Sequence, residues 1–140
     1  MPLTQRPFGL TALSLFFALA TIPSTATALA LAFPGAWSEA MWRLKPDAWK
    51  GFASLGTWAI LLMVVVAAAC AAAAFGVWTR QRWGYWLAIV GLTINLLGDT
   101  LNAWVRGNWR TLIGLPIGGA MLAYLLSDRI REWFGRRPTP

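Results

Sequence analysis

Residues Trp58–Phe75 read WAILLMVVVAAACAAAAF, a run with no charged, amide or hydroxyl side chain. As an α-helix that rises about 1.5 Å per residue, this run approaches the roughly 30 Å thickness of the hydrocarbon core of a bilayer. Arg80 and Arg82 follow it directly. A helix that is apolar on every side is typical of a membrane span and not of the surface of a soluble protein. The run and its flanks therefore predict a transmembrane helix over residues 55–78.

A second apolar run, residues 8–33, is interrupted by Pro23 and neighbouring hydroxyl residues, and it has two interpretations. A cleaved signal peptide would use residues 26–28, Ala-Thr-Ala, as its cleavage site. The apolar character continues well past that site, however, and Arg6 gives only a weakly basic start. These features favour a spanning helix in which serine and threonine hydroxyls satisfy the backbone groups that the proline frees.

Two further runs, residues 85–104 and 111–127, complete the predicted set of spans. Trp109 and Tyr124 flank or end the last run, and such residues suit a membrane interface. Short connections join the last three spans, so these helices are expected to be antiparallel neighbours. The sequence therefore predicts an all-α integral membrane protein, a four-helix bundle in a single transmembrane domain of residues 1–140.

The composition agrees with a membrane protein and disfavours several kinds of site. Charged residues make up 12% of the 140 residues, against about 25% in soluble domains. The net charge is +7, but lysine and arginine stand between apolar runs, which indicates a membrane surface and not nucleic acid. Histidine is absent and Cys70 is the single cysteine, so the usual ligands of zinc, haem and clusters are missing. We expect no metal, no cofactor and no catalytic residue.

Two segments outside the spans mix aromatic with charged residues. Residues 36–52 predict a short amphipathic helix that lies in the interface and is broken at Pro46, with a lid or a docking surface as the alternative. Residues 128–140 form a basic tail that is expected to rest on the anionic cytoplasmic leaflet. Its apolar and basic residues are Ile130, Trp133 and Phe134 with Arg129, Arg131, Arg136 and Arg137.

The distribution of lysine and arginine predicts the orientation in the membrane. Arg6, the connection after residue 78 and the tail together hold seven of these cations on one side. The other side holds five, namely Arg43, Lys45, Lys50, Arg106 and Arg110. Because cytoplasmic loops carry the excess of positive charge, both termini are expected in the cytoplasm, with the chain in the bacterial cytoplasmic (inner) membrane.

The helix over residues 85–104 carries the most informative polar pattern. Small and polar residues fall on one face at helical spacing, and this face is expected to turn toward the bundle and away from lipid. Its members are Ala88, Gly91, Asn95, Gly98, Asp99, Asn102 and Arg106. We take Asn95, Asp99, Asn102 and Arg106 as a candidate polar intramembrane site.

Asp99 is the single acidic residue within the predicted spans, and its role has two interpretations. It lies five residues before Trp104, about 7–8 Å below the interface, where water can reach it. The functional interpretation is a proton or cation site, or a counter-ion for a ligand. The structural interpretation is an ion pair or hydrogen bond with Arg106, two turns away, or with Arg110, whose side chain would reach inward. The shallow depth favours the structural role.

Glycines mark the surfaces where helices are expected to pack closely. Gly114 and Gly118 form a small-xxx-small pattern, and Gly91 and Gly98 lie on the polar face described above. The neighbour is either another helix of the same chain or a second subunit. Packing within the chain is favoured because an internal partner suffices.

Several blocks resemble a widespread group of small prokaryotic membrane proteins with four transmembrane helices. These blocks are Arg6-Pro7-Phe8-Gly9-Leu10, Gly76-Val77-Trp78, Arg82-Trp83-Gly84-Tyr85-Trp86-Leu87-Ala88 and Ala123-Tyr124-Leu125-Leu126. The resemblance covers nearly the whole chain and implies the four-span fold. That group has no established activity, so the resemblance implies no catalytic residue.

Three classes of function remain. The leading one is a non-enzymatic structural or accessory subunit, with the bilayer and either a homo-oligomer or a larger membrane complex as partners. The second is a small oligomeric transporter or channel that uses the stripe of Asn95, Asp99 and Asn102. The third is a membrane-embedded lipid-modifying enzyme, which would normally show clustered acids or a nucleophile beside its base.

Overall fold

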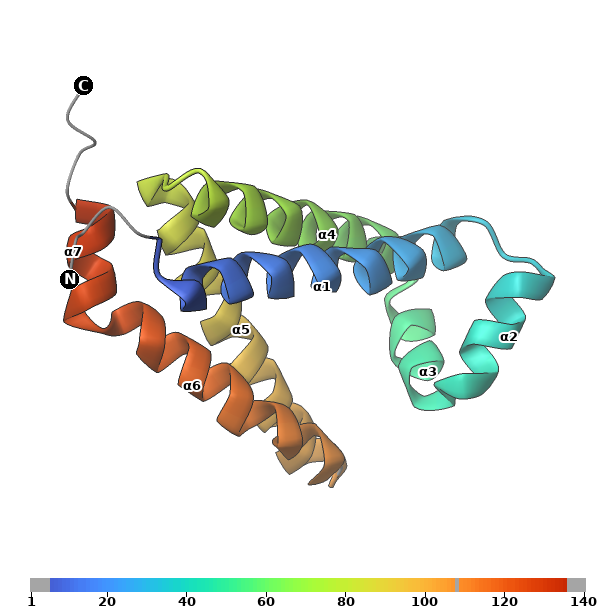
Figure 1. Ribbon diagram of the computed structural model, residues 1–140. Coiled ribbons are helices and arrows are strands. Elements are labelled where there is room, and N and C mark those ends of the chain that lie inside the picture. The colour runs from blue at the N-terminus through green and yellow to red at the C-terminus, as the bar shows by residue number, and fades with distance from the viewer. Residues whose placement is uncertain (1–5, 108, 136–140) are drawn as a thin grey trace. The chain divides into compact units, whose positions relative to one another are not determined.

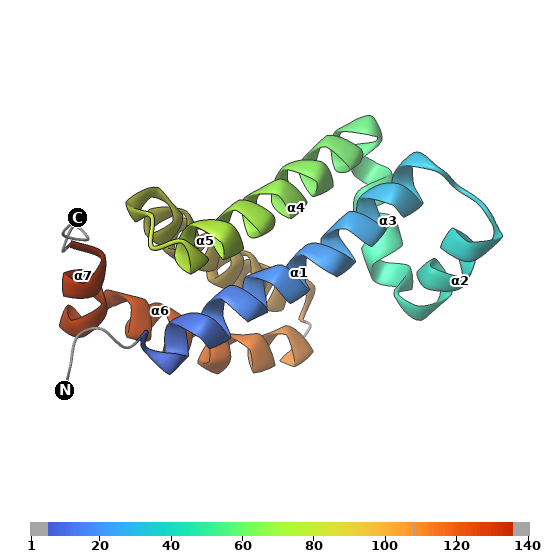
Figure 2. The same cartoon turned by 45° about the horizontal axis from the view of Figure 1, so that its top comes forward.

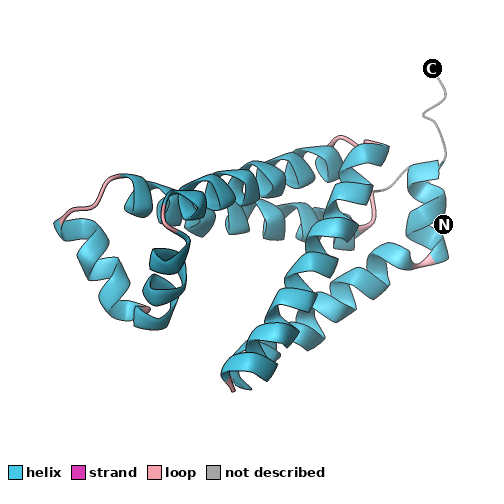
Figure 3. Cartoon of the chain, turned by 180° about the vertical axis from the view of Figure 1, so that it is seen from behind, coloured by secondary structure: helices cyan, strands magenta, loops and turns pink. Residues whose placement is uncertain are grey.

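The computed structural model describes residues 6–107 and 109–135 (Figure 1). Over these residues the protein is all-α, with seven α-helices, one 3-10 helix and no strand (Figure 3). The chain divides into two compact units. One is formed by residues 17–71, and the other by the residues before and after that segment.

Three helices are long and apolar enough to cross a membrane: α1 (Phe8–Ala32), α4 (Thr57–Trp78) and α5 (Arg82–Arg106). They occupy the ranges in which the first three spans were predicted. α5 begins three residues earlier and ends two residues later than the apolar run of 85–104. Arginine is a good helix former, so each end of α5 extends to an arginine that can reach the polar headgroups.

α1 continues through Pro23 without interruption. Three hydroxyl groups around the proline donate to carbonyl oxygens four residues earlier in the same helix. Thr21 donates to Phe17 at 2.9 Å, Ser24 to Ala20 at 2.9 Å, and Thr25 to Thr21 at 2.8 Å. The hydroxyl side chains that interrupt the apolar run are thus hydrogen-bonded to their own helix, where hydrocarbon offers no other partner.

The fourth predicted span, residues 111–127, differs from the expectation of one long helix. The structure has a 3-10 helix, η1 (Trp109–Ile113), followed by α6 (Gly114–Leu126) of 13 residues. α6 alone is about 20 Å long, too short to cross the hydrocarbon core. Pro116 accounts for the difference, because a proline lacks the N–H donor and is tolerated in the first turn of an α-helix but not in its interior. The preceding turn tightens to 3-10 geometry instead.

Within the unit of residues 17–71, the predicted interfacial helix over 36–52 is two helices. α2 (Ala36–Leu44) and α3 (Pro46–Leu55) meet at Lys45. Pro46 is the first residue of α3, a position that suits proline because the N–H there has no intrahelical partner. The ring of Trp42 on α2 lies 5.3 Å from that of Trp49 on α3, so an aromatic contact closes the pair.

In the other unit, α5 and α6 pack side by side, and α7 (Asp128–Gly135) folds back on both (Figures 1 and 2). Ile130 and Phe134 of α7 are buried, and the ring of Phe134 lies 4.9 Å from that of Tyr85. Two of the apolar tail residues that were expected to face lipid therefore pack against protein. Their spacing of four residues places them on one face of α7. Residues 136–140 of the predicted tail lie outside the described residues.

The connection between α4 and α5 is a tight hairpin built on two glycines. A Cβ atom at Gly76 would collide with the backbone of Gly84, and a Cβ at Gly84 would collide with that of Gly76. The Gln81 N–H closes the turn by donating to the Gly76 carbonyl at 2.8 Å, and Arg80 adopts a left-handed backbone with φ of 60°. This backbone contact fixes the distance between α4 and α5 at one end of the unit.

Replacing Gly84 with alanine should destabilise the protein, because backbone atoms cannot move aside as a flexible side chain can. We expect a loss of about 1–3 kcal/mol, measured as a lower thermal unfolding temperature in detergent. Gly119→Ala in α6 is the matched control. No atom lies within 4 Å of a Cβ there, so the variant should be neutral or up to about 1 kcal/mol more stable. Equal unfolding temperatures for the two variants would contradict the hairpin contact.

Candidate functional site

The predicted polar site lies on α5, where the structure brings two of its residues together. Asn95 Nδ2 donates to Asp99 Oδ2 at 3.4 Å, one helical turn apart. Asn95 is exposed near the middle of α5, and Asp99 is half-buried. A carboxylate so placed can accept hydrogen bonds or hold a proton. The hydrogen bond described here is with Asn95, a residue other than the predicted partners Arg106 and Arg110.

Asn102 and Arg106 complete the predicted site but differ in their surroundings. Asn102 is half-buried, one turn beyond Asp99. Arg106 is exposed in the last turn of α5, directly before Gly107, whose left-handed backbone with φ of 62° ends the helix. The cation there interacts favourably with the carbonyl end of the helix dipole.

The predicted packing glycines separate into two groups. Gly118 is buried, and a Cβ there would meet Leu96 Cδ2 at 2.9 Å, so it lies in the contact between α5 and α6. A Cβ at Gly114 would meet Asp99 Oδ2 at 3.2 Å, which places the first turn of α6 beside the carboxylate. Gly91 and Gly98 are instead exposed. The face of α5 that packs on protein is therefore rotated from the predicted one.

The buried residues of α5 define this packing face. They follow helical spacing and are mostly apolar, and they are Gly84, Tyr85, Ala88, Leu92 and Ala103. The stripe of Gly91, Asn95 and Gly98 lies beside it, and within this unit neither α6 nor α7 covers it. We call these three residues the open face of α5. Of the predicted stripe, Ala88 is buried and Asp99 and Asn102 are half-buried, whereas the three residues of the open face are exposed.

A second arrangement, not predicted from the sequence, ties α7 to the α4–α5 hairpin. Arg80 donates from Nε and Nη2 to the Trp133 carbonyl at 3.0 and 2.6 Å, and its guanidinium lies 4.3 Å from the centre of the Trp133 ring. Arg82 Nη2 donates to the Gly135 carbonyl at 2.8 Å. The last carbonyl groups of an α-helix lack partners within the helix. Arg80 and Arg82, more than fifty residues earlier in the chain, donate hydrogen bonds to these carbonyl groups.

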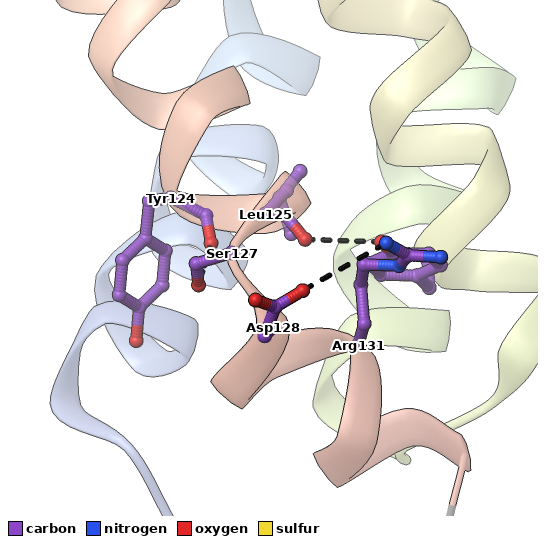
Figure 4. Close-up of polar contacts among 6 residues, drawn as sticks. Tyr124, Leu125, Ser127, Asp128 and Arg131 are labelled. Atoms are coloured by element: carbon purple, nitrogen blue, oxygen red, sulfur yellow. Dashed lines mark hydrogen bonds and ion pairs between the residues drawn. The ribbon is translucent and has the colours of Figure 1, made fainter.

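The junction between α6 and α7 rests on short-range polar contacts (Figure 4). Tyr85 donates its hydroxyl to the Leu125 carbonyl at 3.0 Å in a buried position, and Ser127 donates to the Tyr124 carbonyl at 2.6 Å. Asp128 and Arg131 form an ion pair of 3.8 Å. Both partners are exposed, so this pair adds little stability.

The start of α1 belongs to the same end of this unit. The Arg6 guanidinium lies 4.0 Å from the centre of the Trp78 ring, and its Nη2 donates to Ser14 Oγ at 3.4 Å. A Cβ at Gly9 would collide with the ring and hydroxyl of Tyr124, so the first turn of α1 lies directly against the end of α6. We call this end of the unit the arginine end. Its described cations are Arg6, Arg80, Arg82, Arg129 and Arg131.

The described residues also limit the chemistry of the chain. Within residues 6–107 and 109–135, no three Cys, Asp or Glu side chains gather into a group that could hold a metal ion.

No known family model, no curated protein and no solved structure matches the chain.

Replacing Arg80 with lysine should loosen α7 while leaving α5 folded. A lysine ammonium cannot reproduce the two hydrogen bonds that converge on the Trp133 carbonyl oxygen or the planar stacking on the Trp133 ring. We expect α7 to lose about 1–2 kcal/mol of local stability, seen as roughly tenfold faster amide hydrogen exchange over residues 129–135. Arg110→Lys in η1 removes the same guanidinium at the opposite end and should leave that exchange unchanged. Unchanged α7 exchange in the Arg80 variant would show that the arginine does not hold the helix.

Proposed function

We propose that the chain is a multi-pass protein of the bacterial cytoplasmic membrane and acts as a non-enzymatic structural or accessory subunit of a membrane complex. The apolar surface of the long helices supports the membrane location. On α4, Trp58, Phe75 and Trp78 are each more than half exposed, and the spacing of about 100° per residue places Trp58 and Trp78 on nearly opposite sides of the helix. Lipid is the solvent that removes such a surface from water.

The proposal includes four crossings arranged as a four-helix bundle. Three of them are α1, α4 and α5. For the fourth, η1 and α6 follow one another from Trp109 to Leu126. At about 2.0 Å per residue in the 3-10 part and 1.5 Å in the α-helical part, they reach about 30 Å if coaxial. That length equals the hydrocarbon core.

The orientation with both termini in the cytoplasm is supported by the arginine end. Five described arginines gather there, from the chain before α1, the α4–α5 hairpin and α7. In the same unit, the opposite end of α5 has Arg106 and Arg110. An excess of positive charge at one end of antiparallel spans favours that end in the cytoplasm.

The way in which the spans use their polar side chains supports a structural role over a catalytic or transport role. Thr93 donates to the Ile89 carbonyl at 2.8 Å and Thr100 to the Leu96 carbonyl at 2.7 Å, each within α5. These hydroxyl groups repeat the pattern of α1. They are bonded to their own helix and do not converge on a shared site.

The observation that carries the assignment to a complex is the open face of α5. Asn95 is exposed near the middle of a 25-residue helix, where lipid tails offer an amide no hydrogen bond. Gly91 lies one turn before it and Gly98 one turn after it, so a second backbone can approach closely. A protein partner would satisfy the amide and cover the glycines.

Asn95→Leu should therefore weaken assembly without unfolding the chain. An interhelical hydrogen bond in a membrane contributes about 0.6–2 kcal/mol, so we expect the complex to dissociate about three- to thirtyfold more readily in mild detergent. Size-exclusion chromatography with light scattering measures this against the 15.3 kDa monomer. Thr93→Val is the matched control, since its hydroxyl is already bonded within α5 and assembly should persist.

A wild-type chain that elutes alone as a monomer would overturn the assignment. The second candidate function, a small oligomeric transporter, is favoured by the Asn95–Asp99 hydrogen bond within the same open region. It requires that Asp99→Asn abolish proton- or cation-coupled flux in liposomes while assembly is kept. A structural Asp99 requires instead a change in thermal stability, or little change at all.

A further inference from the structure

The arginine end contains cations that its own helices do not use. Arg80 and Arg82 are engaged by the carbonyl groups of α7, as described above. Arg131 pairs with Asp128 at 3.8 Å. Arg6 and Arg129 remain, on the side of the α6–α7 junction where α1 begins.

Arg6 is held rigidly but is only partly hydrogen-bonded. Its guanidinium is stacked on Trp78, and its Nη2 contact with Ser14 is 3.4 Å long. Its Nε is enclosed and has no hydrogen-bond partner among the described residues. Burial lowers the pKa of the guanidinium from its usual value, yet arginine keeps its charge in proteins. The side chain is thus a fixed cation with unused donors.

Tyr124 connects Arg6 with Arg129. Its ring and hydroxyl lie against the first turn of α1 at Gly9, three residues after Arg6. Arg129 lies in the first turn of α7, two residues after Ser127, whose hydroxyl donates to the Tyr124 carbonyl at 2.6 Å. The first N–H groups of α1 also point toward this end, and they carry partial positive charge.

The acidic residues of this end are placed elsewhere. Residues 1–38 contain no aspartate or glutamate. Asp128 and Arg131 lie across the junction from the Tyr124 side chain (Figure 4). Glu132 is on α7 and is exposed. An anion beside Tyr124 would therefore meet two arginines and a hydroxyl donor, while Asp128 is paired with Arg131.

We propose that Arg6, Tyr124 and Arg129 bind the phosphate of an anionic phospholipid headgroup. The inference rests on the proposed membrane location. Two observations favour a lipid over a soluble anion. The site lies at the ends of apolar helices, which is the depth of the headgroups, and Trp78 beside Arg6 is more than half exposed, as interfacial anchors are. Acyl chains would continue along the exposed apolar surface near the start of α1, where Phe8 is 85% exposed.

The test uses the full chain in nanodiscs of phosphatidylcholine, with and without phosphatidylglycerol, and measures retained lipid by native mass spectrometry. The wild-type chain should retain phosphatidylglycerol in preference to phosphatidylcholine. The double variant Arg6→Gln, Arg129→Gln should lose this preference, by about fivefold for each arginine. Arg129→Gln alone should reduce the preference for phosphatidylglycerol by about fivefold. If the replacement of Arg6 unfolds the chain, this single variant still tests the site.

The matched control Arg106→Gln, Arg110→Gln removes the same charge from the opposite end and should keep the preference. Equal retention of both lipids by the wild-type chain, or an equal loss in the control, would overturn the site. Inorganic phosphate added to phosphatidylcholine nanodiscs should not raise the unfolding temperature. If it does so as strongly as phosphatidylglycerol does, the site takes free phosphate and the lipid assignment is wrong. A chain that fails to enter nanodiscs at all refutes the membrane function instead.

Discussion

Every polar group that lies in an apolar solvent must find its hydrogen-bond partner within the protein. This constraint explains how the long helices use their backbone and hydroxyl groups. Helices meet it for the backbone. Around Pro23, hydroxyl side chains turn back to their own helix, and Thr93 and Thr100 of α5 do the same. Asn95 is the conspicuous contrast, since its exposed amide donates one long hydrogen bond to Asp99. In the proposed function, this exposed amide is the group that a partner subunit would satisfy.

The arginines at the arginine end have two different roles. Two of them end a short helix: α7 has eight residues, too few to be stable by itself, and its carbonyl end is held by Arg80 and Arg82. In the proposed orientation, the positive charge of this end lies at the cytoplasmic surface, and Arg6 and Arg129 are the arginines proposed to bind anionic lipid. Folding of α7 onto the α4–α5 hairpin therefore also concentrates the positive charge at one end.

The sequence predicted the long helices well because their signal, an apolar run between charged ends, is local. It could not predict the division of the fourth span into η1 and α6, since that depends on how Pro116 is accommodated in the first turn of α6. The break of the interfacial segment at Pro46 was predicted, because a proline that begins a helix is a local signal. Within the candidate site, the Asn95–Asp99 contact follows from helical spacing. Two other features could not be predicted: which face of α5 packs on α6, and the hydrogen bonds from Arg80 to α7. Both depend on tertiary packing, which the periodicity of a single sequence does not determine.

The central claim is that α5 crosses a bilayer with the arginine end in the cytoplasm. It is tested most directly by cysteine labelling in cells, because Cys70 is the single native cysteine and can be replaced by alanine. Gln81→Cys before α5 and Trp109→Cys after it are both exposed positions. We predict that a membrane-impermeant maleimide labels position 109 in intact cells and position 81 only after the membrane is disrupted. Labelling of both positions from the same side would contradict the account.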